Sequence, residues 1–196
     1  MPTKLRNQLI GSILEGHEAA FKASFNVENV KLLEQVSEQI AEAFQRGNKI
    51  LLCGNGGSAA DAQHIAAEFI GRFKKERKSL PAIALTTDTS VLTALSNDYS
   101  YETVFSRQVE GLGEKGDVLI GLSTSGTSKN VVEAVKRAKE IGLITIGFTG
   151  KSGGDLKKLC DLNFSAGSTK TPHVQEMHIT ALHAVSEAVE DILFPA

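Results

Sequence analysis

The sequence predicts an α/β fold, a doubly wound parallel sheet with helices on both faces, preceded by an N-terminal helical hairpin. Two features after residue 47 favour the sheet: nearly continuous apolar runs, typical of strands buried on both faces, and helical patterns that separate them. A third feature is that residues 3–46 show helical periodicity alone. We therefore expect a three-layer sandwich of the flavodoxin-like or Rossmann-like class, with two extra helices at its start.

The N-terminal helices are interrupted only around residues 25–29, so we expect two helices joined there. In the second helix, apolar side chains fall on one stripe at helical spacing: Val30, Leu33, Val36, Ile40, Ala43 and Phe44. Because such a stripe has to be covered, we expect the hairpin to pack against the sheet or against another subunit.

The predicted strands are the apolar runs at residues 49–53, 82–86, 117–122 and 143–148, with a weaker run at 161–164. The helices predicted between them span residues 59–72, 90–97 and 129–141, and a long helix from about 173 to 193 follows the last strand. Without an internal repeat or a low-complexity linker, residues 1–196 are expected to form one domain, with the hairpin in 1–46 and the α/β core in 47–196.

Composition excludes several classes of protein. The 21 basic and 23 acidic residues are spread along the chain and leave a formal charge of −2, so we expect no nucleic-acid or membrane partner. The basic cluster GRFKKERK, at residues 71–78, is interpreted as a solvated loop or helix end. No apolar run approaches the roughly 20 residues of a membrane helix, and Cys53 and Cys160 lack metal spacing. We therefore expect a cytoplasmic protein with buried, reduced thiols.

Small polar residues follow each of the four main strands, at the sheet edge where doubly wound folds bind ligands. These loops read GNGGS, TTDTS, STSGTS and TGKSGG. The first fits the loose dinucleotide pattern G-x-G-x-x-A, but its nearest acidic partner, Asp88, comes about 30 residues later instead of about 20. A bound dinucleotide is therefore disfavoured, and the simpler interpretation is a tight turn with Ser58 as the helix N-cap.

The loop from Ser123 to Ser128 is the stronger phosphate signal. Its hydroxyl groups come between a buried strand and a helix, and the free N–H groups at the start of that helix add a partial positive charge. The loop contains no lysine, which a polyphosphate site usually includes. It therefore favours a phosphate monoester such as a sugar phosphate.

His64 and Glu68 lie one to two turns into the helix that follows the first glycine-rich loop. At a spacing of four residues they share one helix face, and a ring nitrogen with a carboxylate oxygen suits Zn²⁺ or a similar divalent ion. A lone His/Glu pair at this spacing is also common as an ordinary contact, so the spacing alone does not decide between the two.

Four segments, GNGGSAADAQH, PAIALTTD, LSND and STSGTS, resemble in their order and spacing the SIS (sugar isomerase) domain. Over essentially all 196 residues the chain resembles the bacterial phosphoheptose isomerase family within it. The resemblance implies an aldose-ketose isomerase that interconverts sedoheptulose 7-phosphate and D-glycero-D-manno-heptose 7-phosphate, for ADP-heptose and lipopolysaccharide core synthesis. It also implies a homotetramer with active sites at subunit interfaces, and one zinc ion per subunit.

The resemblance implies a set of site residues as well. The matching metal positions are His64, Glu68, Gln175 and His183. The matching substrate positions are Asn55, Gly56, Gly57, Glu68, Asn97, Asp98, Ser123, Thr124, Ser125, Ser128 and Gln175. Because eight helical residues place Gln175 and His183 about 12 Å apart, either they lean toward one ion or they belong to sites completed by a neighbouring subunit.

Isomerisation through an enediol(ate) needs a base at carbon and an acid at oxygen. We expect Glu68 and His183 to be the catalytic residues, with Glu68 moving the carbon proton, His183 serving the oxygen atoms and the ion acting as a Lewis acid. A carboxylate that ligates a metal is a weaker base, so Glu68 cannot be fully committed to both roles at once. Either the metal shifts during turnover or its role is chiefly structural. His178, about 140° around the same helix from His183, is expected to pack or to support the site.

A non-enzymatic interpretation stays open. The same fold and length resemble the bacterial DnaA initiator-associating protein, an SIS relative that binds a replication initiator, and the basic cluster at 71–78 is compatible with it. The discriminating feature is the set His64, Glu68 and His183, because a pure binding module has no reason to keep these acid/base residues together.

Overall fold

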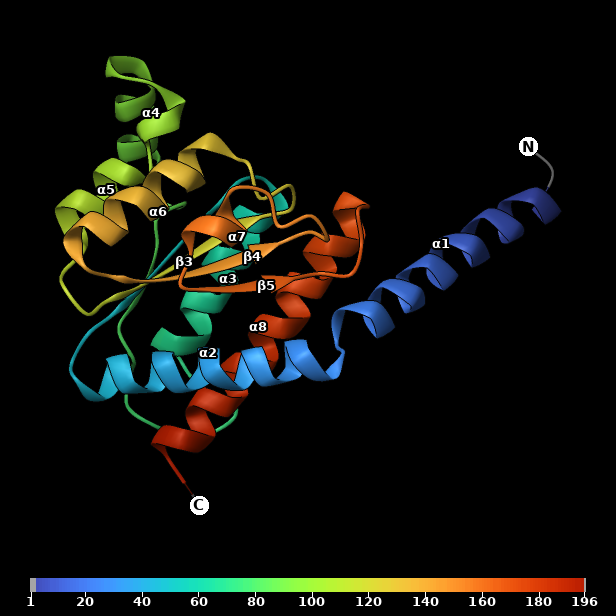
Figure 1. Ribbon diagram of the computed structural model, residues 1–196, viewed down its shortest axis with the longest axis horizontal. Helices are drawn as coiled ribbons and strands as arrows, with labels where there is room; N and C mark the ends of the chain where they lie inside the picture. The colour runs from blue at the N-terminus through green and yellow to red at the C-terminus, as the bar shows by residue number, and fades with distance from the viewer. Residues whose placement is uncertain (1–2, 196) are drawn as a thin grey trace.

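The structure, a computed structural model, describes residues 3–195, with side chains from Gln8 onward (Figure 1). Residues 1, 2 and 196, the ends of the predicted domain, lie outside the described residues. Within the described range, no helix is both long enough and apolar enough to cross a lipid bilayer.

A parallel sheet of five strands forms the centre of residues 3–195. Its order is β2-β1-β3-β4-β5, the flavodoxin-like order of a doubly wound fold. The strands are β1 Ile50–Gly54, β2 Ala82–Ala84, β3 Val118–Ser123, β4 Ile144–Thr149 and β5 Leu162–Ser165. Every residue of β1 and β3 is buried, as their continuous apolar runs predict.

Helices cover both faces of this sheet (Figure 1). One face packs against α2 (Val27–Gln45), α3 (Gly57–Ile70) and α8 (Thr171–Leu193), and the other against α5 (Ser106–Leu112), α6 (Lys129–Ile141) and α7 (Leu156–Leu159). Alternation along β1 divides the core in the same way, because Ile50 and Leu52 join the first group while Leu51 and Cys53 join the other. The predicted three-layer sandwich is therefore confirmed.

The short elements differ most from the prediction. A 3-10 helix η1 (Tyr101–Thr103), α5 and α7 are not predicted, because segments of three to seven residues are too short to show periodicity. In addition, α3 begins at Gly57, so Ser58 lies inside its first turn and Gly56 occupies the N-cap position without a side-chain hydrogen bond. The predicted Ser58 N-cap is therefore wrong.

The first helix, α1 (Thr3–Ser24), corrects the predicted hairpin. It projects away from the body of the molecule instead of folding back along α2 (Figure 1). Its last turn is fastened to the core by the Ser24 hydroxyl, which accepts the Gly167 N–H at 2.8 Å. Asn26 caps α2 directly after this turn by accepting the Asn29 N–H at 2.9 Å, and the chain does not reverse at the connection (Figure 1). Apolar side chains of α1 consequently stay exposed: Leu9, Ile10, Ile13, Leu14 and Phe21.

His178 of α8 is a packing residue of the core. Its ring is fully buried against Phe148 and Phe164, and its Nε2 donates to the Thr149 carbonyl oxygen at 3.0 Å. Its Nδ1 has no partner among the residues the structure describes. Burial lowers the pKa of His178 to about 4 from its ordinary value of 6.5, against the opposing effect of the Thr149 hydrogen bond.

We expect this histidine to make the stability of the protein depend on pH. Between pH 6.5 and 4 the unfolded chain binds a proton at this position that the folded protein excludes, so the free energy of unfolding falls as pH falls through that window. His178→Gln, which keeps an amide donor for Thr149, should show a flatter dependence in urea unfolding at pH 7.5 and 5. An equal change in the free energy of unfolding between the two pH values in both proteins would contradict the prediction.

Candidate functional site

The candidate site lies at the carboxyl edge of the sheet, where β1 and β3 adjoin. From these neighbouring strands the chain continues to opposite faces, to α3 after β1 and to α6 after β3, and such a switch point is where doubly wound folds bind ligands. The turn after β1 brings the end of the strand very close to the start of α3, since a Cβ on Gly54 would stand 2.8 Å from the Cβ of Ser58. Only glycine allows this approach of strand and helix.

The side chain of Asn55 is held at this edge by a reciprocal amide pair. Asn55 Nδ2 donates to Asn130 Oδ1 at 2.9 Å, and Asn130 Nδ2 donates to Asn55 Oδ1 at 2.8 Å. The Tyr101 hydroxyl donates to the same Asn55 oxygen at 3.0 Å. Neither partner is predicted from the sequence. Asn130 comes two residues after the serine loop and could have been suspected, whereas nothing in the sequence places Tyr101 here.

The predicted phosphate loop is a compact cluster of hydroxyl groups. Ser123 Oγ lies 2.9 Å from Ser128 Oγ and 3.3 Å from Ser125 Oγ, and it accepts the Gly126 N–H at 3.1 Å. Gly126 has a φ of +72°, and a Cβ there would meet the carbonyl oxygen of Gly153 at 2.2 Å. Because α6 begins directly after the cluster, its N-terminal N–H groups lie beside these hydroxyls, which suits an anion.

A pocket of about 270 Å³ joins the two loops to the start of α8. It is lined by Asn55, Gly57, Ser58, Thr124, Thr171, Pro172 and Gln175. The Gln175 side chain packs over Gly57, 3.3 Å from where a Cβ would stand, and its amide donates to Asp61 Oδ1 at 2.6 Å. Four predicted substrate residues thus come together in one pocket: Asn55, Gly57, Thr124 and Gln175.

Asp61 is buried beside Gln175 and is not predicted as a site residue. Its Oδ2 has no hydrogen-bond partner among residues 8–195. Burial raises the pKa of Asp61 to about 6, against the lowering effects of the Gln175 hydrogen bond and of nearby His64. In its ionised form Asp61 can accept the hydrogen bond that the Gln175 amide donates and so hold that side chain in place. Its position one turn before His64 was the available sequence signal.

His64, Glu68 and His183 form the other part of the site. His64 Nε2 lies 2.9 Å from His183 Nε2 and 3.2 Å from Glu68 Oε1. His64 and Glu68 come from adjacent turns of α3 and His183 from α8, and both helices pack on the same face of the sheet. A single chain therefore brings these three side chains together.

These three side chains have the composition of a metal site. One donor atom from each lies within 4.8 Å of the others. Two imidazoles and a carboxylate are a ligand set of catalytic zinc sites, which keep a fourth position open. The predicted fourth ligand, Gln175, lies about two helical turns before His183 in α8, and its amide donates to Asp61 instead. The place of Gln175 in the ligand set therefore stays a prediction.

Asn97 and Asp98 lie apart from the pocket. They end α4 (Thr89–Asp98), which projects beyond α5 at the top of the molecule (Figure 1). Both are exposed, and the Asn97 amide donates to Asp98 Oδ1 at 2.9 Å. Their contact with substrate therefore stays a prediction.

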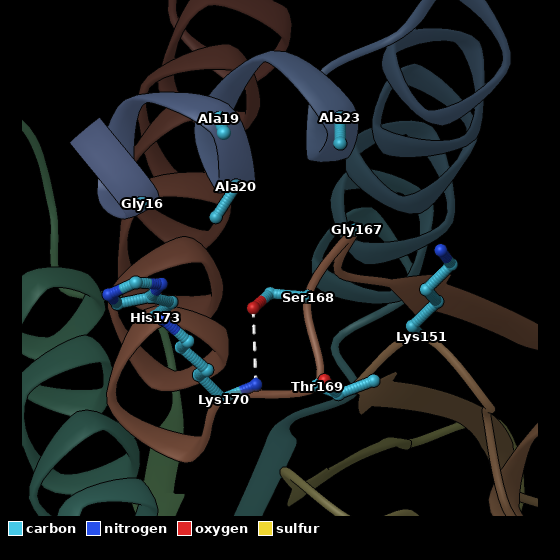
Figure 2. A pocket seen from close by; sticks show the side chains of 10 residues that line it. All are labelled: Gly16, Ala19, Ala20, Ala23, Lys151, Gly167, Ser168, Thr169, Lys170 and His173. Carbon is cyan, nitrogen blue, oxygen red and sulfur yellow. Dashed lines mark hydrogen bonds between the residues drawn. The ribbon is translucent and has the colours of Figure 1, made fainter. Parts of the chain in front are cut away.

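A larger hollow, of about 430 Å³, lies between the last turns of α1 and the segment that enters α8 (Figure 2). Its lining residues are Gly16, Ala19, Ala20, Ala23, Lys151, Gly167, Ser168, Thr169, Lys170 and His173. None of the predicted site residues lines it. We place the candidate site at the smaller pocket, because the glycine-rich loop, the serine loop and Gln175 meet there.

Comparison with known proteins agrees with this geometry. The SIS domain family model matches residues 18–150. The phosphoheptose isomerase of Clostridium acetobutylicum is 51% identical over 190 residues, which are 97% of this chain and 97% of the relative. The chain belongs to the phosphoheptose isomerase family. Another phosphoheptose isomerase, from Roseiflexus sp., is 58% identical over 163 residues, 83% of each chain.

Solved structures of phosphoheptose isomerases share the fold nearly end to end. The protein from Neisseria gonorrhoeae is 40% identical with a TM-score of 0.89, over 94% of this chain and 98% of that chain. The protein from Francisella tularensis is 32% identical with a TM-score of 0.91, over 97% and 100%. The sheet, the flanking helices and the scaffold of the site are thus those of the phosphoheptose isomerase family.

Proposed function

We propose that this protein is an aldose-ketose isomerase that interconverts sedoheptulose 7-phosphate and D-glycero-D-manno-heptose 7-phosphate through an enediol(ate). The observation that supports it most is the joint presence of an acid/base set and a phosphate loop. Along α3, His64 lies about 10 Å from Gly57, which lines the same pocket as Thr124 of the serine loop. A seven-carbon chain with a terminal phosphate can span that distance, so the phosphate can bind at residues 123–128 while the first two carbons lie near Glu68.

The residues of the chain divide the reaction between them. The hydroxyls of the serine loop hold the phosphate, and Asn55, Gly56 and Gly57 form a wall against the sugar. In the ketose-to-aldose direction, the Glu68 carboxylate takes a proton from C1 and returns it to C2. His183 gives a proton to O2 and takes one from O1, so the proton count balances. Fixing the remote phosphate holds both carbons in place for these transfers.

Zinc is the proposed metal, one ion per subunit, held by His64, Glu68, His183 and Gln175. When bound, it supplies Lewis-acid polarisation of the sugar oxygens. Two imidazole nitrogens and one carboxylate oxygen within 4.8 Å support this assignment. A zinc titration of metal-free protein should saturate at one equivalent per subunit, and a failure to bind would contradict the assignment.

The direct test of the activity is incubation with sedoheptulose 7-phosphate, followed by NMR for the aldose. We expect conversion to an equilibrium mixture of both sugars. No conversion, with or without added zinc, would overturn the proposal. A DnaA pull-down tests the non-enzymatic alternative, which the names of the relatives reported above do not support.

Ser125→Ala should raise KM and leave kcat nearly unchanged. The Ser125 side chain is exposed and follows Thr124, which lines the pocket, and a hydrogen bond to a charged phosphate contributes about 1.5–3 kcal/mol, equivalent to at least about tenfold in KM. Steady-state kinetics measure both constants. Ser79→Ala, an exposed serine in the connection before β2, is the control. A fall in kcat at unchanged KM would instead place Ser125 in the chemistry.

Homotetramer assembly is proposed as well. The exposed apolar side chains of α1 support it, since a row of such residues on a projecting helix fits an interface between subunits. The active sites would then lie at subunit interfaces. Sedimentation velocity tests the assembly, and a monomer at micromolar concentration would contradict it.

The proposed cellular role is the supply of heptose for ADP-heptose and lipopolysaccharide core synthesis in the cytoplasm. Both cysteines are free thiols, and Cys53 is buried, which supports a reducing compartment. Heptose content of the core in a strain that lacks this protein tests the role, and an unchanged content would contradict it.

A further inference from the structure

Only one nitrogen of the His183 ring has a polar partner among the described residues. Its Nε2 lies against His64, and within residues 8–195 its Nδ1 makes no hydrogen bond. A histidine that ligates a metal is usually oriented by a hydrogen bond from its other ring nitrogen. Here the ring of Phe73 instead packs on the face of the imidazole, nearly parallel to it, with centroids 5.6 Å apart and an angle of 25° between the planes.

Phe73 is itself held by the helix that contains His183. Its backbone N–H donates to Glu190 Oε1 at 2.9 Å, and the N–H groups of Lys74 and Lys75 donate to Oε2 at 2.8 and 3.0 Å. Glu190 comes seven residues after His183, two turns along the same face of α8. One buried carboxylate thus fixes Phe73 relative to His183.

Arg77 extends this anchor to the other helix of the site. Its Nε donates to Glu190 Oε1 at 2.8 Å, and both side chains are only 1% exposed. Its two terminal nitrogens donate to the carbonyl oxygens of Glu68 at 2.8 Å and Phe69 at 2.7 Å. These are among the carbonyls at the end of α3 that lack partners within the helix. The same segment therefore holds the backbone of Glu68.

Glu190 stays charged in this setting. Although burial alone raises it, the pKa of Glu190 is held below its usual range by the N–H groups of Lys74, Phe73 and Lys75 and by Arg77. The anchor is thus permanently ionised near neutral pH. The basic cluster at 71–78 is consequently a solvated loop only in part, because Phe73 and Arg77 point inward while Lys74 and Glu76 are exposed.

We propose that Phe73 is a positioning residue for His183, and that the buried Arg77–Glu190 pair fixes both Phe73 and the end of α3 that contains Glu68. The inference rests on the proposed function, in which His183 and Glu68 transfer protons and bind zinc. Phe73 acts through His183, since its stacked ring restricts the plane of the imidazole, and in this plane Nε2 faces His64.

The test compares Phe73→Leu, which removes the aromatic face, with Phe73→Tyr, which keeps it. We expect Phe73→Leu to lower kcat and zinc affinity by about tenfold each, as the loss of a ligand-orienting partner does. KM should stay near the wild-type value, because the serine loop is untouched. Phe73→Tyr should keep both kcat and zinc affinity near their wild-type values. Glu76→Gln, an exposed change in the same segment, is the matched control.

A further measurement does not depend on turnover. In metal-free protein the NMR signals of the His183 ring should move in Phe73→Leu, because the ring current of the stacked phenyl is lost, and should stay close to wild type in Phe73→Tyr. If wild-type protein fails to isomerise the sugar but the His183 signals and zinc affinity respond in this way, the proposed function fails and the positioning role stands. If folded Phe73→Leu keeps wild-type zinc affinity and His183 signals, the positioning role is overturned.

Discussion

Glu68→Gln should lower kcat by about a thousandfold while the protein stays folded, since a positioned general base contributes about 10²–10⁴ in rate. The amide keeps the shape of the side chain, whose Oε1 lies 3.2 Å from His64 Nε2, but it cannot accept the carbon proton. The rate is measured by NMR at saturating sedoheptulose 7-phosphate and saturating zinc. Under these conditions, weakened metal binding or substrate binding does not account for the loss.

Two results bear on the role of Glu68 in that experiment. Glu76→Gln, an exposed glutamate that follows α3, should keep the wild-type rate. A Glu68→Gln protein with nearly wild-type kcat would remove Glu68 from the chemistry and leave it only as a metal ligand. Because a ligating carboxylate is a weaker base, the variant distinguishes the two roles that the sequence alone assigns to this residue together.

Glu190→Gln should lower the free energy of unfolding by about 3 kcal/mol or more, the typical cost of breaking a buried ion pair. The substitution leaves the Arg77 guanidinium buried without its counter-charge, and a neutral amide replaces the carboxylate that accepts the N–H groups of Phe73, Lys74 and Lys75. Urea unfolding followed by circular dichroism measures the change. A domain is stable by only about 5–15 kcal/mol, so this loss is large.

Glu187→Gln is the control on the same helix, one turn earlier. Glu187 pairs with Lys74 at 2.6 Å, but both side chains are well exposed, and such surface pairs contribute about 0–1 kcal/mol. We therefore expect a change below about 1 kcal/mol. A similar loss of free energy of unfolding in both variants would show that the buried Arg77–Glu190 pair stabilises the protein no more than an exposed pair.

Local patterns were sufficient for most of the fold. The strands at β1, β3 and β4 follow from apolar runs that only a doubly covered strand has, and α6 follows from its helical period. The direction of α1 could not be predicted in this way. Periodicity shows that a helix has an apolar stripe but not what covers it, and the turn at Asn26 depends on packing of Ser24 against Gly167.

The same distinction, between features that are local in the sequence and contacts that depend on packing, applies to the site. The pairing of His64 with Glu68 and the hydroxyl row at 123–128 are local in sequence, so helix geometry and strand-to-helix order are enough to propose them. Their partners are distant along the chain: Asn55 with Asn130 and Tyr101, His64 with His183, and Glu190 with Arg77. Contacts between residues 46 to 119 positions apart depend on how the layers pack, which no local pattern encodes.

The glycine-rich loop after β1 and the basic cluster at 71–78 illustrate both cases. The loop is a tight strand-to-helix turn because no Cβ fits at Gly54 and Gly56 has a positive φ, and the glycines that allow this are visible in the sequence itself. The basic cluster, by contrast, has the composition of solvated charge. It becomes a support for Glu68 and His183 only after α3 and α8 pack side by side and bury Arg77 against Glu190, since burial, and not residue type, makes that pair strong.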